Sequence, residues 1–194
     1  MEVASQPESS WAIMEGQVRA SYGRVVYSHK THEKCADILL ARLSTIKFWQ
    51  IVLSAASAAG FLSALLGVGT VSSVLGTVVA TVLLGLNAYT KDYDLGEVAQ
   101  KHKQTAHDLW LVREQYLSLL SDIAARTCTF QDMLVRRDNL VLQAHAAYGG
   151  APRTNSKGYT RARLALKQLE DMSFTEQEID AFLPKELKRS KEGT

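Results

Sequence analysis

The sequence predicts an all-α membrane protein, in which a two-helix transmembrane hairpin joins long cytoplasmic helices that form an antiparallel coiled coil or bundle. The first reason is that residues 48–90 contain no Asp, Glu, Lys, Arg or His, although 22% of the whole chain is charged. A charged side chain at the bilayer centre costs about 2.5–3.5 kcal/mol, so a membrane segment requires such an uncharged window. The second reason is that helical apolar stripes flank this window on both sides, whereas no strand pattern occurs.

The uncharged window divides into two predicted spans, residues 48–66 and 70–89, separated by a glycine-rich turn. About 19 helical residues rise about 28 Å, which is close to the thickness of a hydrocarbon core. Because the turn is so short, the two helices must be antiparallel neighbours. The alternative is a buried hairpin inside a soluble bundle. Such a bundle would show polar residues every few positions on an outer face, but the window offers only Ser, Thr, Gln50 and Asn87.

Basic residues predict the orientation of the hairpin. Arg42 and Lys47 precede the first span, Lys91, Lys101 and Lys103 follow the second, and the connecting turn carries no charge. Since positive charge is retained on the cytoplasmic side, both termini of this multi-pass chain are expected in the cytoplasm.

The flanking segments predict the remaining domain organisation. Residues 1–9 are predicted to form a disordered leader, and residues 10–47 an N-terminal cytoplasmic helix that runs into the membrane. Residues 91–147 are predicted to form further cytoplasmic helices, chiefly at 95–126 and 130–147. The helices at 10–47 and 95–126 match in length and are expected to pair beneath the membrane. Residues 148–194 form a C-terminal helical segment with a loop at 148–158, a helix at 159–172 and a disordered tail. Thr175 and Glu178 form a capping box that opens a short last helix.

Catalytic motifs are missing from the sequence. It contains neither a Gly-rich phosphate loop nor a Gly-x-Ser-x-Gly nucleophile elbow. We therefore expect no enzyme activity, no catalytic residue and no cofactor. The net charge of +2 is too small to argue for nucleic-acid binding, so no direct DNA contact is expected.

Histidines provide the only spacing that resembles a metal site. His29, His32 and Cys35 lie on one side of a helix, and a structural zinc would need a fourth ligand from His102 or His107. We favour the alternative that His29 and His32 lie in the coiled-coil seam against His102, and we predict no metal. Cys35 and Cys128 are expected to be small, reduced and buried.

Small residues indicate close helix packing in the membrane, because small side chains let helix backbones approach in lipid. The rows at every fourth position are Ala56, Gly60 and Ala64 in the first span, and Ser72, Gly76 and Ala80 in the second. Further small residues suggest contacts between hairpins as well.

Hydroxyl residues form a second stripe, at Thr70, Ser73, Thr77 and Thr81. In an oligomer this stripe could line a water-filled pore. The alternative is that each hydroxyl bonds back to a carbonyl of its own helix.

Three stretches of the chain resemble the SLATT family in the order, spacing and character of their residues. They are residues 32–65 (HEKCADILLARLSTIKFWQIVLSAASAAGFLSAL), 86–123 (LNAYTKDYDLGEVAQKHKQTAHDLWLVREQYLSLLSDI) and 174–188 (FTEQEIDAFLPKELK). These are two-transmembrane effector domains associated with SMODS nucleotidyltransferases and SLOG proteins. Leu183 and Pro184 make the chain resemble the branch encoded beside reverse transcriptases.

The resemblance implies a homo-oligomeric, pore-forming effector of bacterial anti-phage defence that acts as an ion channel and depolarises the inner membrane. It implies a trigger from a nucleotide second messenger or from a neighbouring protein such as a reverse transcriptase or nucleotidyltransferase. Two rival functions stay open. One is a non-conducting anchor that recruits a soluble partner through its coiled coil, and the other is a membrane enzyme that uses His29, His32 or His102.

Overall fold

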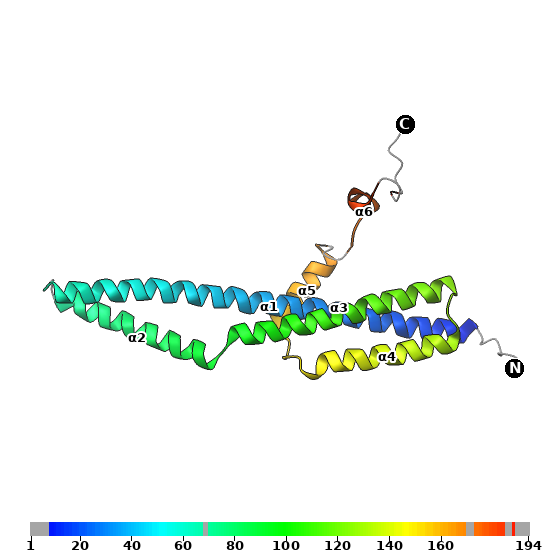
Figure 1. Ribbon diagram of the computed structural model, residues 1–194, viewed down its shortest axis with the longest axis horizontal. Helices are drawn as coiled ribbons and strands as arrows, with labels where there is room; N and C mark the ends of the chain where they lie inside the picture. The colour runs from blue at the N-terminus through cyan, green and yellow to red at the C-terminus, as the bar shows by residue number, and fades with distance from the viewer. Residues whose placement is uncertain (1–7, 68–69, 170–172, 185–187, 189–194) are drawn as a thin grey trace, which may run out of the picture.

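The computed structural model describes residues 8–67, 70–169, 173–184 and 188, and within these residues every regular element is a helix. Figure 1 shows a long rod from whose side the last two helices project. The elements are α1 (Glu8–Leu65), α2 (Thr70–Asp92), α3 (Leu95–Ala125), α4 (Phe130–Gly149), α5 (Ser156–Lys167) and α6 (Glu176–Phe182). The predicted all-α fold is confirmed.

Helix α1 is the spine of the molecule. Its 58 residues join the predicted cytoplasmic helix and the first predicted span without a break, over about 87 Å. No glycine or proline occurs between Gly23 and Gly60, so nothing in the sequence interrupts the helix where it would enter the membrane. Helix α2 packs along the far end of α1, and α3 returns along the near end (Figure 1).

The core lies between α3 and the part of α1 that precedes the hairpin, with α4 closing one side. Two valines of α1 meet a ladder of apolar residues on α3 at helical spacing, as the sequence predicts. The buried cluster comprises Val18, Val25, Leu109, Val112, Tyr116, Leu119, Ile123, Met133 and Leu140. The two helices therefore form the predicted antiparallel pair.

Capping residues explain where the helices begin. The Asp94 carboxylate accepts a hydrogen bond from the Glu97 amide at 2.9 Å, which starts α3 directly after the hairpin. Thr175 and Glu178 form the predicted capping box at the start of α6. Helix α5 begins at Ser156, three residues before the predicted start, because the Asn155 side chain accepts from the Gly158 amide at 2.8 Å.

Other boundaries differ by a few residues. Helix α2 continues to Asp92 and α4 to Gly149, beyond the predicted ends at 89 and 147. Glu8 and Ser9 belong to α1, whereas the rest of the predicted leader, residues 1–7, lies outside the described residues. The predicted tail lies outside them too, apart from Lys188, and so do the last predicted residues of the fifth helix, 170–172.

Candidate functional site: an apolar hairpin and a histidine cluster

The hairpin formed by the far end of α1 and by α2 exposes its apolar side chains. Within the described residues, α2 contains no buried residue, and the apolar window of α1 contains none either. The exposed large apolar residues of the hairpin are Phe48, Trp49, Ile51, Val52, Phe61, Leu62, Leu65, Leu66, Val71, Val74, Leu75, Val78, Val82 and Leu84. An apolar surface of this extent is unfavourable in water but suits lipid. Both helices are long and apolar enough to cross a membrane.

The two helices of the hairpin touch through their backbones at Gly60 and Gly76. A Cβ atom added to Gly60 would lie 2.9 Å from the Gly76 Cα, and one added to Gly76 would lie 3.2 Å from the Gly60 Cα. The Ser72 carbonyl oxygen would lie 3.5 Å from the added Gly60 Cβ. Of the six residues predicted to set helix contacts, these three therefore meet inside the hairpin. Ala56, Ala64 and Ala80 are exposed on its outer surface, so contacts through them would need a partner outside the chain and stay a prediction.

A polar clamp closes the base of the hairpin, at the end that adjoins the helical bundle. The Gln50 amide nitrogen donates to the Asn87 amide oxygen at 2.8 Å and to the Thr90 hydroxyl at 3.2 Å. About two turns before Gln50 on α1, Arg42 donates to the Tyr89 hydroxyl at 2.9 Å. A polar side chain near lipid is stable only when it is paired, so this clamp fixes how α1 and α2 meet. The sequence shows Gln50 and Asn87 as the only amides of the window, but it does not show that they pair.

The hydroxyl stripe lies mostly on the outside of the hairpin. Thr70, Thr77 and Thr81 are exposed, and Ser73 is half-buried beside α1. The Thr77 hydroxyl donates to the Ser73 carbonyl at 2.9 Å, and the Thr81 hydroxyl donates to the Thr77 carbonyl at 2.9 Å. The single chain therefore shows the back-bonded arrangement at these two residues. Pore lining requires other copies and stays a prediction.

Two histidines pair across the bundle that α1 and α3 form. The Nδ1 atoms of His32 on α1 and His102 on α3 lie 2.9 Å apart, and both side chains are buried. One ring must donate while the other accepts, so the hydrogen bond requires that at least one imidazole be neutral. Burial, and then the neighbouring His102 and His29 rings, lowers the pKa of His32 from 6.5 to about 4. Burial also lowers the pKa of His102. At neutral pH both rings are therefore uncharged.

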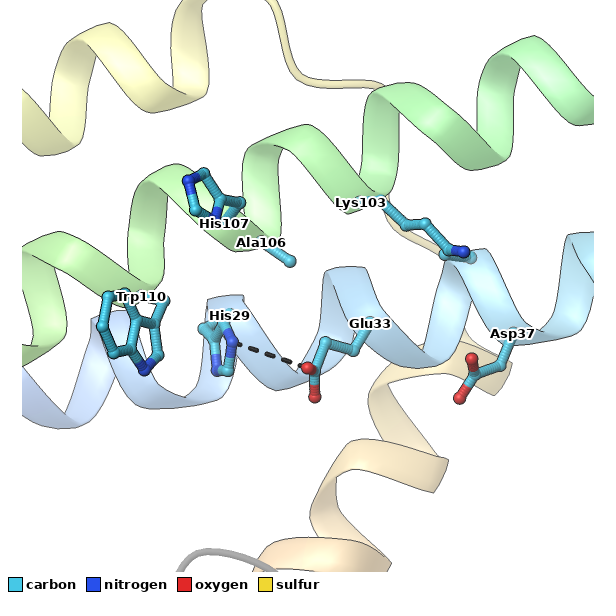
Figure 2. Close-up of a pocket in the computed structure, with 8 residues that line it drawn as sticks. His29, Glu33, Asp37, Lys103, Ala106, His107 and Trp110 are labelled. Atoms are coloured by element: carbon cyan, nitrogen blue, oxygen red, sulfur yellow. Dashed lines mark ion pairs between the residues drawn. The ribbon is translucent and has the colours of Figure 1, made fainter.

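His29 lies one turn from this pair and faces a cavity of about 450 Å³ between α1 and α3 (Figure 2). Its Nε2 atom lies 3.7 Å from a Glu33 carboxylate oxygen, while its buried Nδ1 has no hydrogen-bond partner among the described residues. Burial lowers the pKa of His29, against the opposing effect of Glu33. The residues that line the cavity are His29, Glu33, Ala36, Asp37, Lys103, Ala106, His107 and Trp110. Water can therefore reach the edge of the histidine cluster.

Cys35 belongs to a different contact. Its side chain is fully buried, and a Cβ atom added to Gly158 of α5 would overlap the Cys35 sulfur. The described residues contain no group of three or more His, Cys, Asp or Glu side chains that could hold a metal ion. Cys35 therefore positions α5 on α1, a role that sequence spacing did not suggest. Cys128 is a half-buried free thiol.

The contact between Gly158 and Cys35 leads to a prediction for α5. Gly158→Ala should lower the free energy of unfolding by about 1–3 kcal/mol, because the new methyl group overlaps the sulfur. Thermal unfolding in detergent, together with proteolysis in the loop before α5, measures the effect. The double variant Gly158→Ala/Cys35→Ala should recover most of the loss. Gly23→Ala is the matched control, since nothing lies within 4 Å of a Cβ added there. An unchanged unfolding temperature for Gly158→Ala would contradict the contact.

Comparison with known proteins agrees with this architecture. The chain is not detectably similar to any curated protein or to any solved structure. The family described as SMODS and SLOG-associating 2TM effector domain family 4 matches residues 14–178, which include both hairpin helices, the histidine pair and α5. The match does not distinguish the branch encoded beside reverse transcriptases. Since the matched residues cover most of its length, the chain belongs to the SLATT family of two-transmembrane effector domains of defence systems.

Proposed function

We propose that this membrane effector oligomerises in the bacterial inner membrane and opens a pore that depolarises the cell on a signal. The supporting observation is the hairpin itself, which is uncharged, exposes its outer apolar side chains and is closed on its own seam at Gly60 and Gly76. A hairpin whose two helices touch has no channel between them. Conduction therefore needs several copies arranged in a ring.

The threonine stripe supplies the lining of the proposed pore. Thr77 and Thr81 donate their protons to their own helix and keep hydroxyl lone pairs that can face water. The other exposed side chains of α2 are mostly valine and leucine, and these can contact lipid. In a ring of copies that turns the threonine stripe inward and the apolar side chains outward, the hydroxyls contact water and the apolar side chains contact lipid.

Orientation and control follow from the cytoplasmic bundle. Arg42, Lys47 and Lys91 flank the two spans and support cytoplasmic placement of both termini. We assign the sensing of the trigger to the bundle, through a nucleotide second messenger or a neighbouring protein such as a reverse transcriptase or nucleotidyltransferase. A change in the bundle can reach the pore because α1 continues from one to the other as a single helix.

The test is to induce the protein in bacteria and to follow membrane potential with a dye, with and without the neighbouring genes. Depolarisation that appears only with a trigger is the expected result. A protein that inserts into the membrane but never causes an ion leak, under any trigger supplied by its neighbouring genes, would contradict the pore and would favour the non-conducting anchor.

Replacing the lining threonines tests the pore more directly. Thr77→Val/Thr81→Val conserves side-chain size but removes both hydroxyls, so we expect slower depolarisation with an unchanged amount of protein in the membrane. Ion flux through vesicles that contain the purified variant measures the effect. Thr45→Val is the matched control, because Thr45 makes the same back-bond to Ala41 at 3.0 Å but lies outside the hairpin. Equal flux through the wild type and the double variant would show that these residues do not face the lumen.

A further inference from the structure

Another cavity lies where the loop after α4 leads into α5 and both meet α1 (Figure 1). Its volume is about 340 Å³, within the usual range of small-molecule sites. Three tyrosines line it, namely Tyr27 of α1, Tyr148 of α4 and Tyr159 of α5. Tyr27 and Tyr159 stack with their ring centroids 6.1 Å apart, and Tyr159 is 51% exposed. This aromatic wall is therefore accessible to a flat ring that binds by stacking.

Polar groups of the same cavity are left without a partner in the described part of the chain. The hydroxyls of Ser28 and Thr154 make no hydrogen bond there, and neither do those of the three tyrosines. The His32 ring also lines the cavity. Its Nδ1 atom pairs with His102, which leaves the Nε2 atom available to a ligand. Hydroxyl and imidazole groups can donate or accept, so they suit the mixed donors and acceptors of a heterocyclic base.

The chain around this cavity is basic. Residues 139–169 contain no acidic residue, and their five cations are all exposed and form no ion pair with a described residue. Arg153 lies between Pro152 and Thr154, which both line the cavity. Arg163 follows Tyr159 by one turn of α5 and so lies on the same side of that helix. The positive end of the α5 dipole adds to this charge. The rim of the cavity therefore attracts an anion, and arginine pairs well with phosphate.

We propose that this cavity binds a nucleotide, with its base on the tyrosines and its phosphates on Arg153 and Arg163. A flat heterocycle joined to phosphate matches an aromatic wall, unpaired hydroxyls and unpaired cations at the same time. The inference rests on the proposed function in that it gives the trigger a binding site. A nucleotide in this cavity contacts α1, the loop before α5 and α5 together, and it reaches His32, which pairs with α3. Occupancy therefore acts on α1, the helix that continues into the hairpin.

Equilibrium dialysis of radiolabelled ATP, GTP, CTP and UTP against the full chain in nanodiscs of neutral lipid tests the site. Neutral lipid leaves out anionic headgroups, which could otherwise occupy the cations. We expect saturable binding of at least one of these nucleotides. Its nucleoside alone, or tripolyphosphate alone, should need about tenfold more competitor to displace it, because each supplies only half of the contacts. The proposal is overturned if none of the nucleotides binds saturably, or if tripolyphosphate competes as well as the nucleotide, which would leave a plain anion site.

Substitutions in the cavity identify the contacts. Tyr159→Ala should weaken binding by about tenfold, whereas Tyr159→Phe keeps the ring and should keep the affinity. Arg153→Gln should weaken nucleotide binding by about tenfold and leave competition by the nucleoside unchanged. Trp110→Ala and Lys103→Gln are the matched controls, because both residues line the other cavity, beside His29. Thermal unfolding shows that each variant is folded. Equal losses of affinity in Tyr159→Ala and Trp110→Ala would contradict the assignment of the base to the tyrosines.

The site and the pore fail separately in this design, because dialysis of the purified chain requires no conduction. Saturable nucleotide binding by a chain that never depolarises cells would leave the site intact and would contradict the pore. Depolarisation by a chain that binds none of the four nucleotides would leave the pore intact and would contradict the site.

Discussion

Gly76→Leu is expected to abolish depolarisation while the protein still inserts into the membrane. Even a single Cβ at position 76 would lie 3.2 Å from the Gly60 Cα, so a leucine must force α1 and α2 apart. Separation of the helices would also pull Gln50 away from Asn87 and open the polar clamp at the base. The measurement is membrane potential after induction, combined with the amount of protein in the membrane fraction.

Gly85→Leu is the matched control for Gly76→Leu. It adds the same side chain to the same helix, but nothing lies within 4 Å of a Cβ at Gly85, which is exposed. This control should keep activity. Full depolarisation by Gly76→Leu would show that the seam between α1 and α2 is not required. Equal loss in both variants would assign the effect to added volume on α2 and not to the seam.

Acid is expected to destabilise the packing of α1 against α3. The pKa of His32 is 6.5 when unfolded and about 4 when folded, so the unfolded chain takes up a proton that the folded chain refuses. Stability is therefore complete above pH 6.5 and is lost as the pH falls from 6.5 towards 4. At pH 5 the loss is about 2 kcal/mol for His32 alone. The lowered pKa values of His102 and His29 act in the same direction.

Thermal unfolding in detergent at pH 7.5 and pH 5 measures this effect, and we expect Tm to fall by about 5 °C. His32→Asn/His102→Asn should remove most of the dependence on pH, because an asparagine amide can replace each Nδ1 atom without titrating. His145→Asn is the control, since His145 is exposed on α4 and should leave the dependence unchanged. A wild-type Tm that is equal at both pH values would contradict the role of the buried pair.

The histidine pair shows where sequence reasoning reaches its limit. Periodicity places His32 on the apolar stripe of the N-terminal helix and His102 on that of the third helix. It does not state that the two Nδ1 atoms lie 2.9 Å apart. That distance depends on the register between α1 and α3, which the hairpin and the turn at Tyr93 and Asp94 determine together. A shift of one helical turn would move the rings about 5.4 Å apart along the axis.

The small residues of the hairpin lead to the same conclusion. Their spacing predicts close approach somewhere along the two spans, but three of the six predicted positions lie on the outside. The crossing point at Gly60 and Gly76 depends on where the chain turns at Gly67, whose positive φ of 72° glycine can adopt without strain. The sequence did not indicate that α5 docks on α1 through Gly158 and Cys35. A glycine next to a loop is read as part of that loop, because glycine is typical of loop composition.

By itself, the sequence determined the helical class, the uncharged hairpin and the matched helices that flank it, because hydrophobic periodicity and the cost of charge in lipid act locally along the chain. Only the tertiary structure decided which glycines touch, which histidines pair and where α5 rests. These contacts join residues far apart in the sequence, such as His32 with His102 and Cys35 with Gly158. Their geometry follows from the packing of whole helices. If one helix shifted by one turn along its neighbour, every residue at the contact would face a different partner.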